Sequence, residues 1–379
     1  MDVDNQRRPS LHPWVMTGST RRKATSPPAG ELETFILQQV LEHPDDIARI
    51  TAEHFGITRQ AVSRHLKRLV EEGKLQASGA TRSRTYDLAI LSEDAFSLDV
   101  SPALDEHEVW RARVSSLLRG LPKNVEAICH YGFTEMLNNV VDHSEGRSVT
   151  IAVRRTAASV VILIRDDGVG IFRKITKALD LSDERLAVLE LSKGKLTTDP
   201  RRHSGEGIFF TSRMFDTFYL ASGPIRLLCR GSKSMLLDAR EPWLPVQDLL
   251  ALDPREGTDV LLDISTQSER TMESVFDRFS DSLEEDYGFV RTQVPVSLAR
   301  FGEENLVSRS QAKRLLVRFE RFKEVVLDFS GVETVGQAFA DEIFRVFPLD
   351  HPGVRLSWLN ATSQVEKMIR RAIAARGES

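Results

Sequence analysis

Three short segments in the middle of the chain carry polar side chains and glycines at spacings that could form a ligand site. On a helix, at about 100° per residue, Glu135, Asn139 and His143 fall on one side. A carboxylate can accept a proton from water, and a carboxamide oxygen can ligate Mg²⁺. The other side of Phe133–Ser144 is apolar, formed by Met136, Leu137, Val140 and Val141. Taken alone, this segment equally fits an ordinary amphipathic surface helix.

The second segment follows an apolar strand. Val160–Ile164 runs directly into Arg165–Ile171, which holds Asp166, Gly168 and Gly170 in the order Asp-x-Gly-x-Gly. Glycines let the backbone turn tightly and approach a flat ring, and a carboxylate at the mouth of the turn can accept a hydrogen bond from an exocyclic amine. The pattern therefore predicts a ligand site where a buried strand ends.

The third segment, Ser204–Phe210, places Gly205 and Gly207 before an apolar stretch. Backbone N–H groups freed by glycine at the start of a helix attract phosphate. Two other nucleotide motifs do not fit. Gly194-Lys195 lacks the first glycine of a P-loop, and neither glycine pair extends to the GxGxxG dinucleotide pattern.

In this order the three segments resemble the Bergerat-fold ATPases, which include type II topoisomerases such as gyrase, ninety-kilodalton heat-shock chaperones, mismatch-repair ATPases, histidine kinases and anti-sigma kinases. The resemblance covers about residues 104–268 and implies ATP and Mg²⁺ as ligands. It implies that Asn139 ligates Mg²⁺, that Asp166 binds the adenine amine and that Glu135 is the catalytic group. The implied ATP-binding residues are Asn139, His143, Asp166, Gly168, Gly170, Lys195, Gly205 and Gly207.

The same resemblance implies a lid over the triphosphate between the two glycine motifs, at Phe172–His203. Its candidate phosphate contacts are the basic residues Lys193, Lys195, Arg201 and Arg202. A solvated basic loop would have the same sequence character, so that alternative stays open for each of them.

The surrounding elements indicate a multidomain α/β protein. With 379 residues, 41% of them hydrophobic, the chain can bury two or three cores. No run reaches about 18 apolar residues and the N-terminus lacks an apolar signal region, so we expect a cytoplasmic protein without a membrane partner. Cys129 and Cys229 are too few for a disulfide framework or a zinc cluster, and we expect inert core thiols.

The pattern divides the chain into five parts. Residues 1–30 are typical of a disordered basic arm, and residues 31–90 of a winged helix-turn-helix. Residues 104–268 predict an α/β sandwich, with helices on a mixed sheet. Residues 269–290 predict a connecting amphipathic helix, and residues 291–379 a small α/β domain.

The N-terminal domain carries a local positive charge although the chain has a net charge of −4. Residues 57–86 hold seven basic residues and two acidic ones, a local sum of +5. Thr58 can cap a helix whose inward side chains are Val62, Leu66 and Leu69. The segment resembles winged helix-turn-helix regulators, which implies DNA as a partner of residues 58–86, usually bound by a homodimer. Candidate DNA contacts are Arg59, Gln60, Ser63, Arg64, Lys67, Arg82 and Arg84. The alternative is a protein-binding platform.

The C-terminal part alternates strands and helices. Glu324–Val332 predicts a strand entering a loop, and Phe339–Phe347 an amphipathic helix. This order resembles the sulfate-transporter and anti-sigma-antagonist (STAS) fold. In that family a serine near the start of the helix is phosphorylated to break a partner complex. Val335–Ala338 offers no hydroxyl there, so we expect a STAS-like domain that docks a protein partner without that switch.

Three functions remain open on this evidence. The first is a transcriptional regulator in which an ATP–Mg²⁺ module and the STAS-like domain modulate DNA binding. The second is a protein kinase or ATPase that uses Glu135, and the third is a nucleotide-gated protein switch without DNA. His107-Glu108 resembles the start of a phosphoacceptor histidine motif, but Val109–Arg111 does not continue it, and Pro122 leaves little room for a dimerisation hairpin.

Overall fold

The computed structural model describes residues 28–80, 83–196, 205–231, 233–237, 257–280, 288–300 and 304–376. The chain divides into two compact units, Met1–Glu72 with Ala77–Asp87, and Gly73–Gln76 with Leu88–Ser379. Among the described residues, no helix combines the length and the apolar character needed to cross a membrane. The basic arm predicted for residues 1–30 lies outside the described residues, except for its last three positions.

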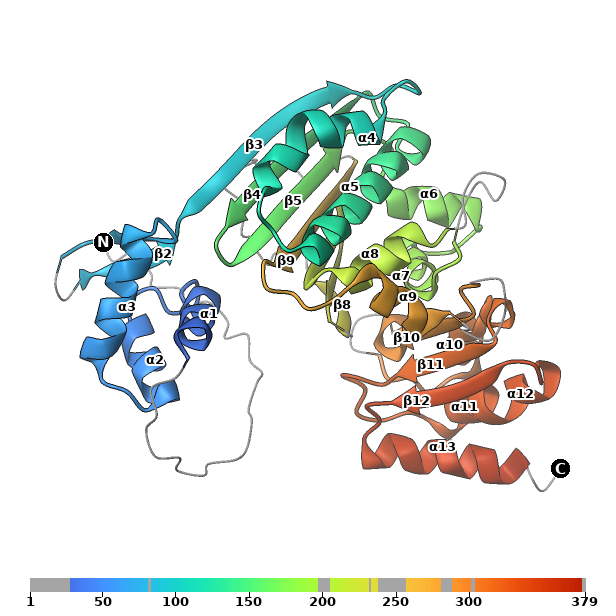
Figure 1. Ribbon diagram of the computed structural model, residues 1–379. Coiled ribbons are helices and arrows are strands. Elements are labelled where there is room, and N and C mark those ends of the chain that lie inside the picture. Colours follow the sequence, from blue (N-terminus) through green and yellow to red (C-terminus); the bar gives the residue numbers. More distant parts are fainter. Residues whose placement is uncertain are drawn as a thin grey trace, which may run out of the picture. The chain divides into compact units, whose positions relative to one another are not determined.

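The N-terminal part contains three helices followed by two strands. These are α1 (Ala29–Gln39), α2 (Ile47–Phe55), α3 (Arg59–Glu71), β1 (Leu75–Ser78) and β2 (Thr85–Leu88), and the strands pair as a two-stranded sheet. The elements follow the predicted order (Figure 1).

Local sequence signals explain where α3 begins and which face it buries. Thr58 caps the helix, because its side chain accepts a hydrogen bond from the Ala61 N–H at 3.2 Å. Helix α2 ends at Phe55, because the next residue, Gly56, has a left-handed backbone conformation (φ 66°). The predicted inward residues Val62, Leu66 and Leu69 are fully buried.

The central part is built on a seven-stranded sheet. Its strands are β3 (Ile90–Asp99), β4 (Ser148–Thr156), β5 (Ser159–Asp166), β6 (Thr217–Ser222), β7 (Ile225–Arg230), β8 (Lys233–Leu237) and β9 (Thr258–Ser265). Their order is β3-β4-β5-β9-β6-β7-β8, and every neighbouring pair is antiparallel. A mixed sheet was expected here, but the described strands of this sheet pair antiparallel, and the parallel pairs β10–β11 and β11–β12 lie in the C-terminal part. The sheet also begins earlier than expected, because β3 precedes residue 104.

Helices cover one face of this sheet. They are α4 (Glu106–Val109), α5 (Lys123–His143), α6 (Ile171–Ala178), α7 (Glu184–Lys193), α8 (Gly207–Met214) and α9 (Met272–Phe279), the last at the predicted connecting helix. The long helix α5 packs across β5 and β9 (Figure 1). Successive side chains of a strand point to opposite faces. On β5, Val160, Ile162 and Ile164 accordingly join the main core, while Val161 and Leu163 belong to a smaller apolar cluster.

The C-terminal part alternates strands and helices as predicted. The strands β10 (Arg291–Pro295), β11 (Glu324–Asp328) and β12 (Arg355–Leu359) form a parallel sheet. The helices are α10 (Arg309–Leu316), α11 (Gln337–Asp341), α12 (Phe347–Asp350) and α13 (Ser363–Arg376). Helix α11 begins after Gly336, so no hydroxyl lies at its N-cap.

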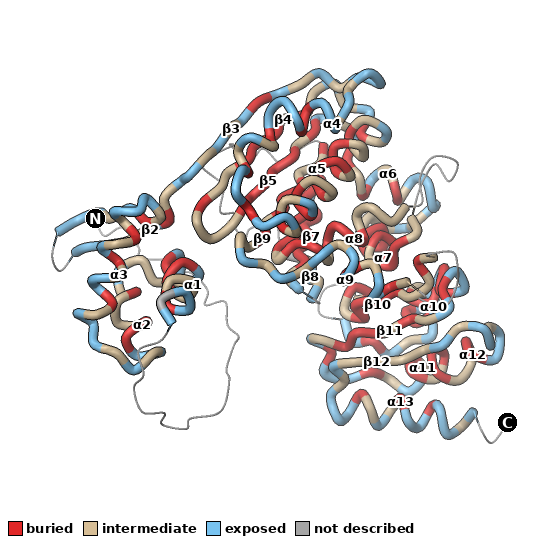
Figure 2. Tube along the Cα trace, viewed as in Figure 1, coloured by how far each residue is buried: buried red, intermediate tan, exposed pale blue. Residues whose placement is uncertain are grey.

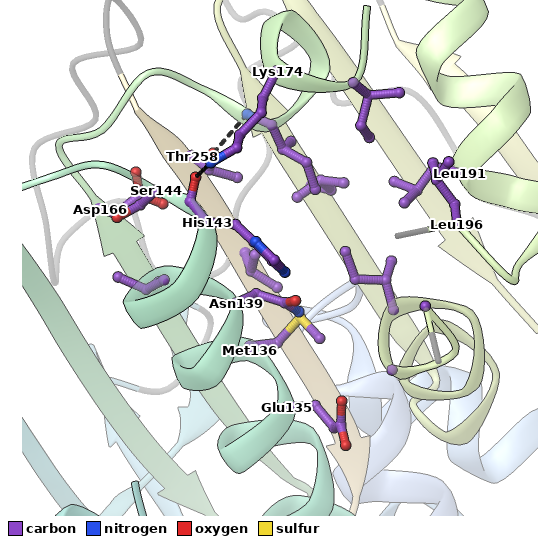
Figure 3. A pocket seen from close by; sticks show the side chains of 18 of the residues that line it. Glu135, Met136, Asn139, His143, Ser144, Asp166, Lys174, Leu191, Leu196 and Thr258 are labelled. Carbon is purple, nitrogen blue, oxygen red and sulfur yellow. Dashed lines mark hydrogen bonds between the residues drawn. The ribbon is translucent and has the colours of Figure 1, made fainter. Parts of the chain in front are cut away.

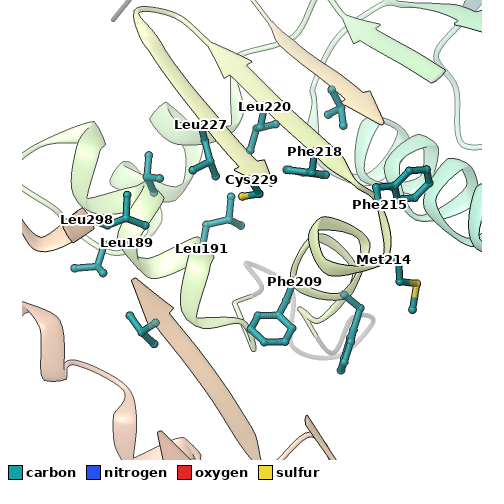
Figure 4. Close-up of a cluster of buried hydrophobic side chains, with 14 of the residues drawn as sticks. Leu189, Leu191, Phe209, Met214, Phe215, Phe218, Leu220, Leu227, Cys229 and Leu298 are labelled. Carbon is teal, nitrogen blue, oxygen red and sulfur yellow. The ribbon is translucent and has the colours of Figure 1, made fainter. Parts of the chain in front are cut away.

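The central and C-terminal parts share one hydrophobic core. The buried segments in Figure 2 run from the seven-stranded sheet through α7 and α8 into β10 and β11. Figure 4 shows Leu189 and Leu191 of α7 and Phe209 of α8 in this cluster, together with Leu298 from the turn after β10. Cys129 and Cys229 are buried within the same core without a disulfide, as predicted.

Candidate nucleotide site

The three polar residues of α5 face one cavity. Glu135, Asn139 and His143 lie on successive turns and line a cavity of about 310 Å³ (Figure 3). Asp166, at the end of β5, lines the same cavity. Much of the remaining wall is apolar, including Met136, Val140, Ile175, Leu220 and Val260. The predicted side chains of Glu135, Asn139 and Asp166 thus line one cavity, and its apolar wall could pack against a flat ring.

Asn139 has unused hydrogen-bonding capacity. Its Nδ2 atom is buried and has no hydrogen-bond partner within the described part of the chain. A buried polar atom without a partner costs free energy, and most such atoms in proteins are satisfied. A ligand in the cavity would remove that cost.

The N-terminus of α8 closes against Glu135. A Cβ atom on Gly207 would lie 2.0 Å from Glu135 Oε2, so the carboxylate of Glu135 packs directly against this glycine. The preceding residue, Glu206, makes no side-chain cap to the helix. Gly205, Glu206 and Gly207 all line the cavity. The first N–H groups of α8 therefore face a space that an anion could occupy.

The carboxyl group of Asp166 is buried, which makes its charged form less favourable. It is 5% exposed, and burial raises the pKa of its carboxyl to about 6, although backbone N–H groups of Gly168 and Thr258 oppose the rise. The Gly168 N–H donates to Asp166 Oδ1 at 2.8 Å. This fixes the carboxyl orientation and leaves part of its accepting capacity for a ligand.

The two glycines after Asp166 are needed for different reasons. A Cβ on Gly168 would lie 2.1 Å from the Ser144 carbonyl oxygen at the end of α5, although Gly168 itself does not line the cavity. Gly170 has φ 86°, a Cβ there would meet Ser222 Oγ at 2.5 Å, and α6 starts at the next residue. Both positions thus depend on glycine, as the Asp-x-Gly-x-Gly pattern predicts.

Sequence reasoning missed two polar residues of the cavity. Lys174 lines it from α6, and its Nζ donates to the His143 carbonyl oxygen at 2.7 Å and to Glu145 Oε1 at 2.9 Å. Thr258 lines it from β9, and its Oγ1 accepts from the Ile171 N–H at 3.1 Å. Neither residue lies in a recognisable motif, because each is brought in by the fold from another segment.

Neither of the two described basic residues proposed as phosphate contacts of the lid lines the cavity. Lys193 is fully buried, with its Nζ 2.6 Å from Glu190 Oε1, so its assignment as a phosphate contact is wrong. The structure does not bring Lys195 to the cavity either, because its Nζ donates to the Arg321 carbonyl oxygen at 3.1 Å. Ser204 and the other two lid candidates, Arg201 and Arg202, lie outside the described residues.

The candidate DNA contacts of α3 share one exposed face. It is formed by Arg59, Gln60, Ser63, Arg64 and Lys67. Lys67 has a carboxylate at 3.6 Å, on Glu71, whereas Arg59 and Arg64 have none among the described residues. Arg84 is exposed and lies over the ring of Tyr86, and Arg82 is outside the described residues.

His107 lies outside the cavity. Its Nδ1 is 3.2 Å from Nε2 of His130 on α5. Residues 106–118 are helical throughout, first as α4 (Glu106–Val109) and then in π and 3-10 geometry, and a short turn leads on to α5. That His107 is not a phosphoacceptor stays a prediction.

Helix α5 and the loops at Asp166 and Gly205 follow one another in the chain in the order predicted from the sequence, and all three line one cavity. Residues 100–226 match a family model described as a histidine kinase-like ATPase domain. Residues 311–366 match a STAS-like domain of unknown function. No curated protein gives a match to the chain. The central and C-terminal domain types predicted from the sequence are confirmed, while the winged helix stays a prediction.

The donor set also fits Mg²⁺ delivered with a nucleotide. Within the described residues there is no group of three or more His, Cys, Asp or Glu side chains that could hold a metal alone. Mg²⁺ usually keeps one or two protein ligands and completes its shell with phosphate and water oxygens. The Asn139 carboxamide, with its unpartnered Nδ2, has an oxygen of the right chemistry for such a ligand.

The raised pKa of Asp166 predicts opposite effects of Asp166→Asn on stability and binding. The folded state binds this proton more tightly than the unfolded chain does. The carboxyl's contribution to stability is therefore fully present below pH 3.8 and is lost as the pH rises through about 6. At pH 7.5 the neutral asparagine should stabilise the ligand-free protein by about 2–3 kcal/mol. Calorimetric melting should show this gain shrinking towards pH 4, and Mg–ATP affinity should fall by about tenfold.

Asp263→Asn is the matched control. Burial also raises the pKa of Asp263 to about 6, but this residue of β9 does not line the cavity. It should give a similar gain in stability and leave ATP affinity unchanged. Equal ATP affinity in Asp166→Asn and wild type would remove Asp166 from the nucleotide site.

Proposed function

We propose that this chain is a Mg²⁺–ATP-binding protein whose central domain works as a nucleotide-dependent switch of the histidine-kinase or anti-sigma type. The observation that carries the proposal is one cavity lined by three features: buried Asp166, the first residues of α8, and Asn139, whose buried Nδ2 has no partner among the described residues. The match of residues 100–226 to a histidine kinase-like ATPase domain supports it.

The two ends of the cavity suit the two ends of the nucleotide. Asp166 can accept from the adenine amine beside the apolar wall, and Gly170 gives the ring close access. The N–H groups around Gly205 and Gly207 suit phosphate oxygens. Asn139 would ligate Mg²⁺, which supplies charge neutralisation for the phosphates when it is bound.

Glu135 is the group that decides whether ATP is consumed. It lies on the same face of α5 as Asn139, one turn away, and its carboxylate packs against Gly207. From there it can orient a water molecule or a hydroxyl group and accept its proton. ATP hydrolysis or transfer of the terminal phosphoryl group to a protein partner is then the chemical output, and the STAS-like domain is the proposed docking element for that partner.

A second candidate function, a DNA-binding regulator, is favoured by α3. The exposed side chains of Arg59 and Arg64 have no carboxylate partner among the described residues, and Thr58 fixes the start of the helix. The order of three helices and a two-stranded sheet is that of a winged helix-turn-helix. On this proposal ATP binding changes the affinity of a dimer for DNA.

Asn139→Ala tests the nucleotide site. It removes the proposed Mg²⁺ ligand, so titration calorimetry should show Mg–ATP affinity reduced by about tenfold or more. The matched control is Asn138→Ala, because Asn138 is the neighbouring asparagine but donates to Glu106 Oε1 at 3.2 Å outside the cavity. If both variants bind Mg–ATP as wild type does, the assignment of the cavity is wrong.

Glu135→Gln separates catalysis from binding. It should keep Mg–ATP affinity within a few-fold, because the side chain retains its shape. Phosphate release in single-turnover assays should slow by about 10²–10⁴-fold, because the proton acceptor is lost. An unchanged rate would assign hydrolysis to another group, and a wild-type protein with no turnover at all would leave ATP as a signal that is only bound.

Arg64→Ala tests the DNA-binding proposal. If Arg64 contacts phosphate, the variant should bind genomic fragments more weakly, and the slope of log affinity against log salt should become shallower by about 1. Arg49→Ala is the control, because Arg49 lies on α2 in an ion pair with Glu53 at 2.9 Å. Wild-type protein that captures no DNA at low salt, with or without ATP, would rule out the regulator function.

A further inference from the structure

A buried arginine of the STAS-like region holds the segment that follows α7. Arg318 lies between α10 and β11 and is 7% exposed. Its guanidinium donates to Glu190 Oε2 at 3.0 Å and to the Glu190 carbonyl oxygen at 3.2 Å. It also donates to the carbonyl oxygens of Gly194 and Lys195, at 2.7 and 2.6 Å. One side chain therefore fixes three backbone carbonyl groups and one carboxylate.

A second buried cation stabilises the same carboxylate. The Nζ of Lys193 donates to Glu190 Oε1 at 2.6 Å and to the Val317 carbonyl oxygen at 2.8 Å, and its side chain is fully buried. The Glu190 carboxylate thus has a cation on each oxygen. Removing Arg318 would leave a complete Lys193–Glu190 pair, whereas removing Glu190 would leave two buried cations unpaired.

The backbone around this cluster is strained. Arg318 and Lys195 have left-handed backbone φ angles of 66° and 50°, which residues other than glycine rarely adopt. Such conformations persist where the surroundings fix them, and they gather at functional sites. Here the Arg318 guanidinium donates to the Lys195 carbonyl oxygen, so one hydrogen bond joins the two residues with left-handed backbone.

The held segment forms part of the wall of the nucleotide cavity. Leu191 and Leu196, which flank Gly194 and Lys195, both line the cavity (Figure 3). The Leu196 N–H donates to the Gly205 carbonyl oxygen at 3.1 Å. A Cβ on Gly205 would lie 2.4 Å from the Leu196 backbone. The position of Leu196 therefore constrains the glycine loop that leads into α8.

We propose that Arg318 is a positioning residue of the nucleotide cavity, so that the STAS-like region is a structural component of the ATP site as well as a docking element. The inference rests on the proposed ATP-binding function. It implies reciprocal coupling: ATP binding should tighten the contact between α7 and the STAS-like region, and a partner that alters that contact should change ATP affinity.

The test compares three substitutions of Arg318 in the full-length chain. Arg318→Ala should lower Mg–ATP affinity by about tenfold, measured by titration calorimetry. Arg318→Lys should recover only part of that loss, since one ammonium group cannot reproduce the planar fork that reaches three carbonyl oxygens. The control is Arg355→Ala, because Arg355 lies on β12 of the same region with its side chain 77% exposed. It should bind like wild type.

Arg318→Gly distinguishes positioning from general stability. Glycine removes the guanidinium but relieves the left-handed strain, so this variant should melt at a higher temperature than Arg318→Ala. If Arg318 positions the cavity wall, both variants lose ATP affinity equally. If the affinity of the glycine variant instead recovers along with its melting temperature, the inference is wrong.

Hydrogen exchange separates this inference from the proposed function. Without nucleotide, the amides of residues 191–196 should exchange faster in Arg318→Ala than in Arg355→Ala. Unchanged exchange there, or wild-type ATP affinity in Arg318→Ala, overturns the positioning role and leaves ATP binding standing. Wild-type protein that binds no Mg–ATP contradicts the proposed function, and the exchange comparison then decides by itself whether Arg318 holds the cavity wall.

Discussion

The cavity depends on how closely α5 packs against the short segment that joins α8 to β6. At Gly132 a Cβ would lie 2.4 Å from the ring of Phe215, so only glycine permits the observed separation. At its end, α5 is fixed to the loop after β5, because the Ser144 carbonyl oxygen accepts from the Val169 N–H at 2.9 Å. Asn139 lies between these two points. The close contact in the middle of α5 and the hydrogen bond at its C-terminal end together fix where Asn139 lies relative to Asp166.

The same packing makes the site energetically unfavourable without a ligand. Asp166 is buried with its pKa raised to about 6, and the buried Asn139 Nδ2 finds no hydrogen-bond partner among the residues that the structure describes. Both costs would fall if a ligand supplied a donor to the carboxyl and a partner to the carboxamide. Buried polar groups that reduce stability in this way often occur at functional positions. Both of these side chains line the same cavity.

The sequence predicts those parts of the site that lie within single elements. Helical spacing identifies Glu135 and Asn139, and paired glycines identify the loops around Gly168 and Gly207, because these signals depend on a few neighbouring residues. Contributions from packing between distant segments are not visible in this way. Thr258 enters the cavity from a strand that is remote in sequence, and the basic residue Lys193 points into the C-terminal region. The charge of Lys193 suggested a phosphate contact, and nothing near it in the sequence indicated that it would bind the Val317 carbonyl oxygen instead.

The C-terminal region was expected to be a separate docking module, but the core argues for a closer association. Phe209 of α8, just beyond the glycine loop of the cavity, has its ring centroid 4.4 Å from that of Phe289, two residues before β10. Phe289 in turn contacts Phe322, which precedes β11. Aromatic packing therefore runs from the cavity into the parallel sheet, alongside the hydrogen bonds of Arg318. A change in the STAS-like region would thus reach α8 through packed side chains, with no need for a mobile linker.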